Sequence, residues 1–336
     1  MTPKLQEDRR AKSDAIFSGI DLLTPIWRQV LQLSSINVND NFFDLGGDSS
    51  LALQLFTEIA KTCGRELPPV TIYQAPTIAA LAALLERPTT LRFPALVLLK
   101  PGVANPPVFI AHGLGGSVMD FFQPVKYIRS DHAIYGLQTR GIDDVDEPLE
   151  SIEDMARFYL DAVRKVQTRG PYLLVGYSLG GLVVLEMAQR LTAAGEKVAL
   201  LVMIDAYPHM SQLSLGQRTL LIARQARRGL HSFTDLRGGA SYQPPAGVLL
   251  TPAMQRVRDS AYMALTRYRP HYYPGNIKFV RAAISSGFPT NARAVWANLA
   301  KKIEVETLPG DHLGMIATHF EKLASTLSRY LDEATR

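Results

Sequence analysis

The sequence is poor in cysteine. Its 336 residues include one, Cys63, which cannot form an internal disulfide. Cys63 also has no partner at the spacing of metal ligands, so no metal site is expected. A chain of this kind suits a reducing compartment, and the cytoplasm is the default expectation. We expect Cys63 itself to be a small thiol that is buried or partly buried.

Long apolar runs are also absent. No stretch approaches the roughly 18 apolar residues that a membrane-spanning helix needs. The opening residues mix charges of both signs with few apolar side chains, so they lack the apolar centre of a signal peptide. We therefore expect neither a membrane span nor a secretory signal, and we interpret residues 1–20 as a flexible leader.

Positive charge is present but not clustered. The formal net charge is +5, yet Lys and Arg are scattered, and no basic stretch is interleaved with aromatic residues in a known nucleic-acid motif. The sequence therefore predicts no nucleic-acid partner, and we interpret the charge as solvated surface. A length of 336 residues suits one large core with a small companion domain.

Helical periodicity dominates residues 21–87. Apolar residues recur at helical spacing just after Asp21 and again after the loop NDNFFDLGGDS, and a short turn of helix follows at Ile72 and Tyr73. Thr77 is placed to cap a last helix, IAALAALLE. Four short helices in so few residues predict a small bundle, and residues 88–95, with two prolines, predict a linker.

From residue 96 to 336, apolar runs typical of strands alternate with amphipathic helical segments. Seven such runs occur: ALVLL, PVFIAH, HAIYGL, YLLVGY, ALLVMID, IKFVRA and IEVETL. This alternation predicts a mostly parallel sheet with helices on both faces. One segment, about 208–274, replaces a short connection with helical runs rich in arginine, and we interpret it as a lid insertion.

The motif GYSLGG places Ser178 between a strand and a helix. Glycines around a serine on such a sharp turn allow a strained backbone and a close approach of neighbouring elements, and the turn exposes the hydroxyl. The helix N-terminus then lies beneath an oxyanion formed when the serine attacks a carbonyl. We therefore predict Ser178 as a nucleophile.

A serine nucleophile needs a base and an orienting acid. His312 stands in LPGDHLG, directly after the last strand, where the hydrolase fold delivers its base, whereas His319 is interpreted as a surface residue in the final helix. Asp205 ends the strand after the nucleophile, and the segment AAISSGF after the next strand has no carboxylate, so we predict Asp205 as the acid. Asp311 is expected to serve local loop structure.

Two backbone N–H groups are expected to form the oxyanion hole. One is the amide of Leu179, directly after the nucleophile. The other is predicted at Leu114, within AHGLGG, where glycines allow the backbone to approach a carbonyl. His112 begins this loop, and we interpret it as a brace because the triad needs only one histidine.

The loop DNFFDLGGDSS combines glycines with a serine, Ser49, at the start of a helix. Free backbone amides and the helix dipole favour an anion such as a phosphodiester there. Taken alone, the pattern favours the simpler alternative of an N-cap serine, which is common. Ser50 is the next residue and also carries a hydroxyl, so the sequence alone does not decide between the two serines.

From about Asp21 to Glu86 the chain resembles the peptidyl carrier domains of nonribosomal peptide synthetases and related polyketide systems. The resemblance lies in IWRQVL, NFFDLGGDS and IYQAPTIAALA. In that family the modified serine directly follows the position of Asp48. The resemblance therefore implies 4'-phosphopantetheine, covalently attached to Ser49, as the cofactor.

From about Ala95 onward the chain resembles the terminal thioesterase domain that follows such carriers. The resemblance lies in GYSLGG, the acid at the end of the next strand, and the GDH loop. Ser178, Asp205 and His312 match the family's triad positions one by one. Leu313 follows the base, where an aromatic residue is at least as common. The resemblance implies a carrier domain at residues 21–87 and a thioesterase domain at 96–336.

Together the two resemblances imply a serine thioesterase. It would release an acyl or peptidyl cargo by hydrolysis or cyclisation through an acyl-serine intermediate, and its partners would be a phosphopantetheinyl transferase and upstream synthetase or acyl-loading enzymes. Three alternatives remain: an acyltransferase that uses an external amine or alcohol, a non-catalytic carrier or docking module, and a plain lipase or esterase. The last leaves the carrier unexplained.

Overall fold

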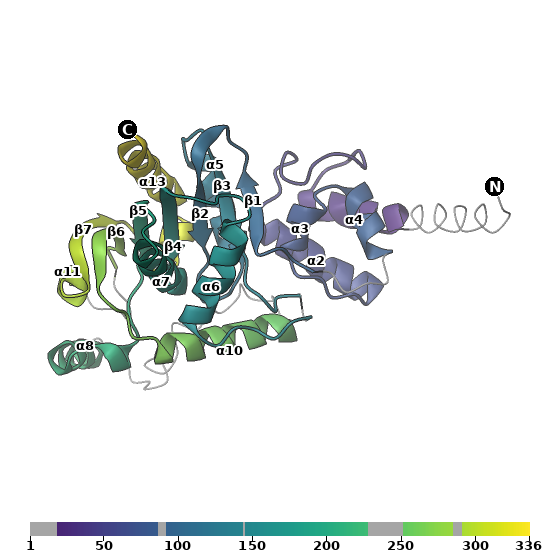
Figure 1. Ribbon diagram of the computed structural model, residues 1–336. Coiled ribbons are helices and arrows are strands. Elements are labelled where there is room, and N and C mark those ends of the chain that lie inside the picture. Colours follow the sequence, from purple (N-terminus) through teal and green to yellow (C-terminus); the bar gives the residue numbers. More distant parts are fainter. Residues whose placement is uncertain (1–18, 87–91, 144, 228–250, 285–290) are drawn as a thin grey trace. The chain divides into compact units, whose positions relative to one another are not determined.

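A computed structural model describes residues 19–86, 92–143, 145–227, 251–284 and 291–336. The chain divides into two compact units, one built by the N-terminal helices up to Phe93 and one built around a sheet from Pro94 onward (Figure 1). Each unit is described by itself. Residues 1–18 of the predicted leader and 87–91 of the linker region lie outside the described residues.

The first unit is a bundle of short helices, as its periodicity predicts. Residues 19–31 form the first helix, which begins two residues before the expected start at Asp21. They are followed by α2 (Ser49–Cys63), α3 (Thr71–Gln74) and α4 (Ile78–Leu85). The indole of Trp27 and the ring of Phe42 are fully buried and meet edge to face at 5.3 Å, so the loop before α2 is tied to the core of the bundle.

The predicted cap of the last helix in this unit is confirmed. Thr77 is the N-cap of α4, and its hydroxyl oxygen accepts the N–H of Ala80 at 3.1 Å. Cys63, at the end of α2, is partly buried, and burial raises the pKa of its thiol.

The second unit contains a seven-stranded sheet with the order β1-β3-β2-β4-β5-β6-β7. Its strands correspond one by one to the seven apolar runs. Only β1 is antiparallel to its neighbour, β3, among the strands of this sheet. Their bounds are β1 (Leu96–Lys100), β2 (Ala104–Ala111), β3 (His132–Leu137), β4 (Tyr172–Tyr177), β5 (Val198–Ile204), β6 (Tyr273–Ala282) and β7 (Ala300–Leu308).

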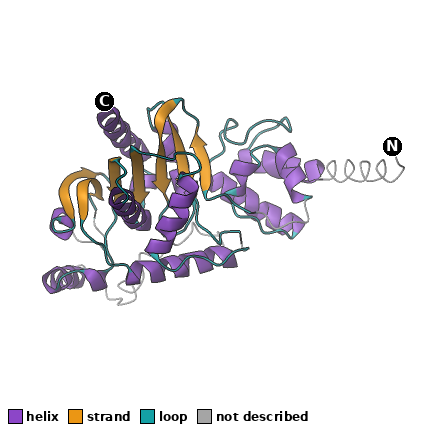
Figure 2. Ribbon diagram, viewed as in Figure 1, coloured by secondary structure: helices purple, strands orange, loops and turns teal. Residues whose placement is uncertain are grey.

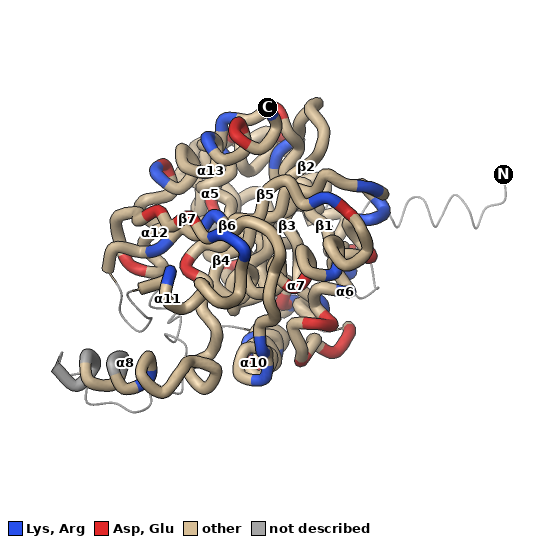
Figure 3. Tube along the Cα trace, turned by 60° about the vertical axis from the view of Figure 1, so that its left-hand side comes forward, with Lys and Arg blue, Asp and Glu red and all other residues tan. Residues whose placement is uncertain are grey.

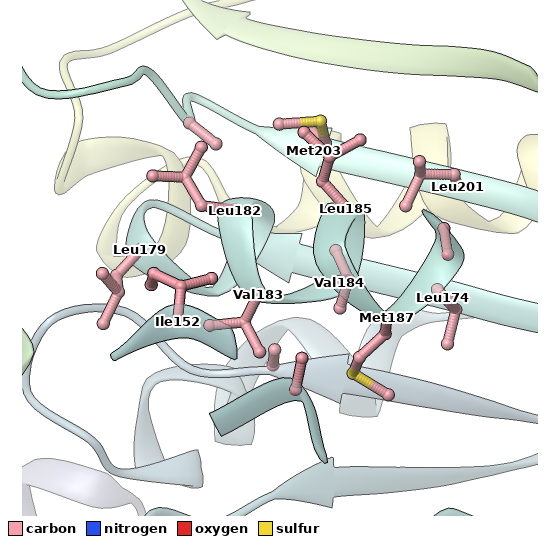
Figure 4. Packing of buried hydrophobic residues seen from close by; sticks show 14 of the residues in the cluster. Ile152, Leu174, Leu179, Leu182, Val183, Val184, Leu185, Met187, Leu201 and Met203 are labelled. Carbon is pink, nitrogen blue, oxygen red and sulfur yellow. The ribbon is translucent and has the colours of Figure 1, made fainter. Parts of the chain in front are cut away.

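Helices cover both faces of this sheet, as predicted (Figure 2). On one face α6 (Ile152–Val163) and α7 (Leu179–Ala193) pack on the strands, and Figure 4 shows Leu182 and Leu185 of α7 among the buried side chains. On the other face lie α5 (Phe122–Tyr127) and α13 (Phe320–Thr335). Alternate residues of β4 serve the two faces: Leu174 packs toward α7 and Val175 toward α13, as the strand period of two requires.

The remaining elements are short helices and the two helices of the predicted lid segment. The short ones are η1 (Val118–Phe121), η2 (Met210–Gln212), α11 (Ala292–Trp296) and α12 (Gly314–Ala317). Within 208–274 lie η2, α8 (Leu215–Arg227) and α10 (Pro252–Arg267), whereas residues 228–250 lie outside the described part. Figure 3 shows basic and acidic positions interspersed along the described chain.

Candidate active site

Ser178 occupies the turn between β4 and α7. Its backbone has φ of 54° and ψ of −121°, a combination that a residue with a side chain rarely adopts. Among the described non-glycine residues, positive φ occurs at Gln32, Ser178 and Asp205, so two of three belong to this site. The strained turn leaves the Ser178 side chain partly exposed, as a nucleophile requires.

The glycines of the turn are needed because neighbouring backbone lies against them. A Cβ on Gly176 would lie 2.2 Å from the carbonyl oxygen of Gly180, and one on Gly180 would lie 2.3 Å from that of His112. Real Cβ atoms do not come this close to other atoms, so a residue with a side chain at either position would force the neighbouring backbone to move. The second contact also brings the start of α7 against the loop after β2.

The three predicted triad residues form one chain of hydrogen bonds. His312 Nε2 lies 3.0 Å from Ser178 Oγ, and His312 Nδ1 lies 2.8 Å from Asp205 Oδ2. A carboxylate only accepts, so Nδ1 carries the proton and Nε2 can accept the serine proton. This is the geometry that makes a serine hydroxyl nucleophilic near neutral pH.

Asp205 is held from both sides directly after β5. Its N–H donates to the carbonyl of Val280 at 2.7 Å, and its Oδ1 accepts the N–H of Ala282 at 3.1 Å. Only 4% of Asp205 is exposed to solvent. The second carboxylate oxygen is therefore left in one position, where it faces His312.

Tyr177 supports His312, the predicted base, and this contact was not predicted from the sequence. Its ring stacks on the imidazole of His312 at 4.8 Å, and its hydroxyl donates to the backbone carbonyl of His312 at 2.9 Å. Burial raises the pKa of Tyr177 well above its usual range, with nearby carboxylates adding to the effect, so the phenol stays protonated. The only available signal was its position beside the nucleophile.

Near the GDH loop, the structure agrees with the expectation for Asp311 and differs from it for His319. Asp311 Oδ1 accepts the N–H of Gly314 at 2.7 Å, in line with the local role expected of it. His319, however, is not inside the final helix: it is the N-cap residue of α13, partly buried in the break after α12. A Cβ on Gly310 would lie 2.5 Å from the ring of His319, so His319 packs against the loop that carries His312.

The loop after β2 is braced by His112, as predicted. The buried ring places Nδ1 2.6 Å from the carbonyl oxygen of Gly113 and Nε2 2.5 Å from the hydroxyl of Tyr159. Nδ1 therefore donates to the carbonyl, and Nε2 accepts from the phenol. Burial lowers the pKa of His112 to about 4, so the ring is neutral. Leu114 follows in this loop and is partly buried, and its oxyanion role stays a prediction.

A second carboxylate near His312, that of Asp120, was not predicted from the sequence. It lies in η1, seven residues beyond Gly113, and its carboxylate accepts a hydrogen bond from the Gly113 backbone. Burial raises the pKa of Asp120 to about 6, although the Gly113 hydrogen bond and the nearby His312 both favour the charged form. Nothing in the run SVMDFF distinguishes this aspartate from an ordinary helix residue.

In the helical unit, Ser49 is the first residue of α2, after the loop that the sequence singles out. The N-cap is Asp48, whose Oδ1 accepts the N–H of Leu51 at 2.8 Å, so the alternative in which Ser49 caps the helix is wrong. The backbone N–H groups of Ser49 and Ser50 lie in the first turn of α2, where a helix has no carbonyl of its own to accept them, so they can donate to an anion. The residues present therefore fit a phosphodiester on this turn.

Other kinds of site find no support in the part of the chain that the structure describes. Within those ranges, no three or more His, Cys, Asp and Glu side chains are grouped as a metal site would require. Every helix there is too short or too polar to span a bilayer.

The fold and the hydrogen-bonded triad define an α/β-hydrolase. Family comparison gives the particular class: the chain belongs to the thioesterase domain family, whose model matches residues 106–331. Residues 21–85 match the phosphopantetheine attachment site family, in which the group is carried covalently on a serine. The chain thus pairs a carrier with a thioesterase domain, which supports a hydrolase acting on thioesters.

Relatives of this chain are large synthetases. It is 42% identical over 221 residues to a dimodular nonribosomal peptide synthase of Bacillus subtilis (strain 168), an alignment that covers 62% of this chain and 9% of that protein. It is 36% identical over 173 residues to an indigoidine synthase of Dickeya dadantii (strain 3937), covering 52% of this chain and 12% of that protein. The chain therefore spans only a small part of these relatives.

Solved structures show the same fold. A holo four-domain nonribosomal peptide synthetase is similar with a TM-score of 0.59 and 22% identity, over 93% of this chain and 26% of that chain. The type II thioesterase BorB of the borrelidin cluster is similar with a TM-score of 0.56 and 19% identity, over 72% of this chain and all of that one.

Proposed function

We propose that this chain releases an acyl or peptidyl cargo from a thioester through an acyl-Ser178 intermediate. The observation that carries the proposal is the hydrogen-bonded series Ser178, His312 and Asp205 at the carboxyl edge of a parallel sheet, in a thioesterase-family domain joined to a carrier. A phosphopantetheine arm on Ser49 would supply a terminal thiol that presents the cargo as a thioester.

In the first step, Ser178 Oγ attacks the thioester carbonyl while its proton passes to His312 Nε2. The new C–O bond forms, the C–S bond breaks, and His312 returns the proton to the departing thiolate. Asp205 holds Nδ1–H throughout and stabilises the imidazolium, a role that its buried, doubly anchored carboxylate suits.

Negative charge develops on the carbonyl oxygen during the attack. The amide of Leu179, the first residue of α7, is one proposed donor to it, and the amide of Leu114 is the other. Donors already fixed before the reaction need no rearrangement, and removing one from such a hole costs about 10²–10³-fold in rate.

The second step transfers the acyl group from Ser178 to a nucleophile. A water activated by His312 gives a free acid, whereas an amine or hydroxyl within the cargo gives a ring. Tethering cargo and hydrolase on one chain raises their effective concentration to about millimolar, which gives a reason for the pairing of the two domains.

The surroundings of the reaction are part of the proposal. The segment at about 208–274 keeps its predicted role as a lid, the organisation is leader, carrier, linker and thioesterase with the bounds given above, and the location is cytoplasmic. A phosphopantetheinyl transferase modifies the carrier, and upstream synthetase or acyl-loading enzymes supply the cargo, in keeping with the synthetase relatives.

The proposal is tested with acyl N-acetylcysteamine thioesters, which present the same bond without the carrier. Wild type is expected to release free acid, and Ser178→Ala to lose this activity. Ser130→Ala is a matched control, because Ser130 precedes β3 at the opposite edge of the sheet and its Oγ only accepts the N–H of His132. Equal turnover by wild type and Ser178→Ala would overturn the proposal.

An acyltransferase is the rival that the same assay separates. With an added amine or alcohol, a hydrolase gives the same free acid, whereas a transferase gives amide or ester as the main product.

A further inference from the structure

Gly113 and Leu114 share the peptide unit that would serve the oxyanion. The carbonyl of that unit belongs to Gly113 and its N–H belongs to Leu114. Since a peptide bond is planar and trans, the two groups point in opposite directions, and holding the carbonyl also aims the N–H. Two donors hold it: His112 Nδ1 at 2.6 Å and the N–H of Gly116 at 3.2 Å.

The preceding peptide is held by Asp120. Its carboxylate accepts a hydrogen bond from the Gly113 backbone, and Oδ2 lies 3.6 Å from the position that a Cβ on Gly113 would take. The two peptide units on either side of the Gly113 Cα are thus both fixed. A glycine has the freest backbone of all residues, so without these contacts the orientation of the Leu114 amide would be poorly defined.

Asp120 also belongs to the cluster around the base. The same Cβ position on Gly113 lies 3.0 Å from the ring of Tyr177, and that ring stacks on His312. The titratable groups that face the carboxyl are His312, whose charged form favours the carboxylate, and the phenol of Tyr177, which is also near Asp205 and Asp311. The negative charge of Asp120 therefore favours the imidazolium of His312 that forms during the attack.

We propose that Asp120 is a positioning residue of this thioesterase, whose carboxylate fixes the Gly113 peptide and so aims the Leu114 amide at the developing oxyanion. The inference rests on the proposed function. It adds to the triad a carboxylate that contacts neither the serine nor the base directly but acts through the loop after β2.

Two substitutions separate the hydrogen bond from the charge. Asp120→Asn keeps an oxygen that can accept from Gly113 but removes the charge, and Asp120→Ala removes both. Glu196→Gln is the matched control, because Glu196 Oε2 also accepts a glycine N–H, from Gly170 at 2.8 Å, at the opposite edge of the sheet.

The readouts are kcat and KM on an acyl N-acetylcysteamine thioester, and the rate at which a fluorophosphonate labels Ser178. For Asp120→Ala we expect kcat and the labelling rate to fall about 10- to 100-fold with KM within about 2-fold, because the lost interaction acts in the transition state. Asp120→Asn is expected to fall less. Its deficit should shrink below about pH 6, where the wild-type carboxyl is itself neutral.

The outcomes are distinguishable. Wild-type rates in both Asp120 variants, or an equal loss in Glu196→Gln, would overturn this inference alone. A wild type that neither hydrolyses the thioester nor reacts with the fluorophosphonate would overturn the proposed function and this inference with it. If Asp120→Ala does not fold, Asp120→Asn, which preserves the shape of the side chain, gives the same decision from its kcat and pH profile.

Discussion

The substitution Asp205→Asn has a predictable consequence because both carboxylate oxygens are engaged. Oδ1 accepts from Ala282 N–H and Oδ2 accepts from His312 Nδ1. An asparagine has one oxygen and one NH₂ group, so it can accept at only one of these places. The backbone N–H of Ala282 cannot become an acceptor. The amide oxygen therefore turns to Ala282, and the NH₂ group faces His312.

That orientation reverses the tautomer of the base. His312 Nδ1 would accept from the NH₂ group, Nε2 would carry the proton, and Nε2 could no longer accept the proton of Ser178 Oγ, 3.0 Å away. The equivalent change in a serine protease triad leaves the geometry intact and lowers kcat about 10⁴-fold. We expect a loss of about 10³–10⁴-fold here, equivalent to about 4–5.5 kcal/mol of transition-state stabilisation.

The assay is single-turnover labelling of Ser178 by a fluorophosphonate, with thioester hydrolysis alongside. The fold should survive because the asparagine has the same size and keeps the Ala282 contact, so the thermal melting profile is the control. Labelling within about tenfold of wild type in a folded Asp205→Asn variant would refute the tautomer argument.

Three further predictions are tested through stability. Gly176→Ala places a methyl 2.2 Å from a carbonyl oxygen in the first turn of α7, so thermal melting should show a loss of about 1–3 kcal/mol or more in the free energy of unfolding. Gly216→Ala is the control and should be near neutral, because open space surrounds Gly216. Equal effects of the two substitutions would contradict this prediction. Asp120→Asn should raise the melting temperature at pH 7.5. Burial raises the pKa of Asp120 from 3.8 to about 6, so the folded protein favours the neutral carboxyl. Wild type therefore loses stability as the pH rises from about 4 through 6, whereas the neutral asparagine does not. A gain that persists below pH 4 would oppose this account. Asp48→Ala removes the cap of α2 and should destabilise the carrier by about 1 kcal/mol by chemical denaturation, with hydrolysis of free thioesters unchanged.

Much of the fold could be predicted because its elements have simple periods. The seven strands are apolar runs bounded by polar or glycine-rich segments, and the parallel arrangement follows from the helices between them. The triad residues could be found because chemistry restricts the choice: few histidines are available, and no carboxylate follows β6 directly in AAISSGF, which leaves Asp205.

The supporting residues could not be found in this way. Asp120 lies seven positions after Gly113 and outside any motif, and the contact exists only because η1 turns back on the loop after β2. Tyr177 reaches His312 across 135 residues through the packing of parallel strands. His319 was misplaced because the helical pattern near the C-terminus does not show the break between α12 and α13.

The central claim is that cargo held on Ser49 passes to Ser178. The most direct measurement is intact mass after incubation with coenzyme A and a broad-specificity phosphopantetheinyl transferase, followed by an acyl load, in wild type, Ser49→Ala and Ser178→Ala. The account predicts one added phosphopantetheine in wild type and Ser178→Ala and none in Ser49→Ala, with the acyl group persisting longer in Ser178→Ala than in wild type. No added mass in any of the three, or equal lifetimes of the acyl group, would contradict it.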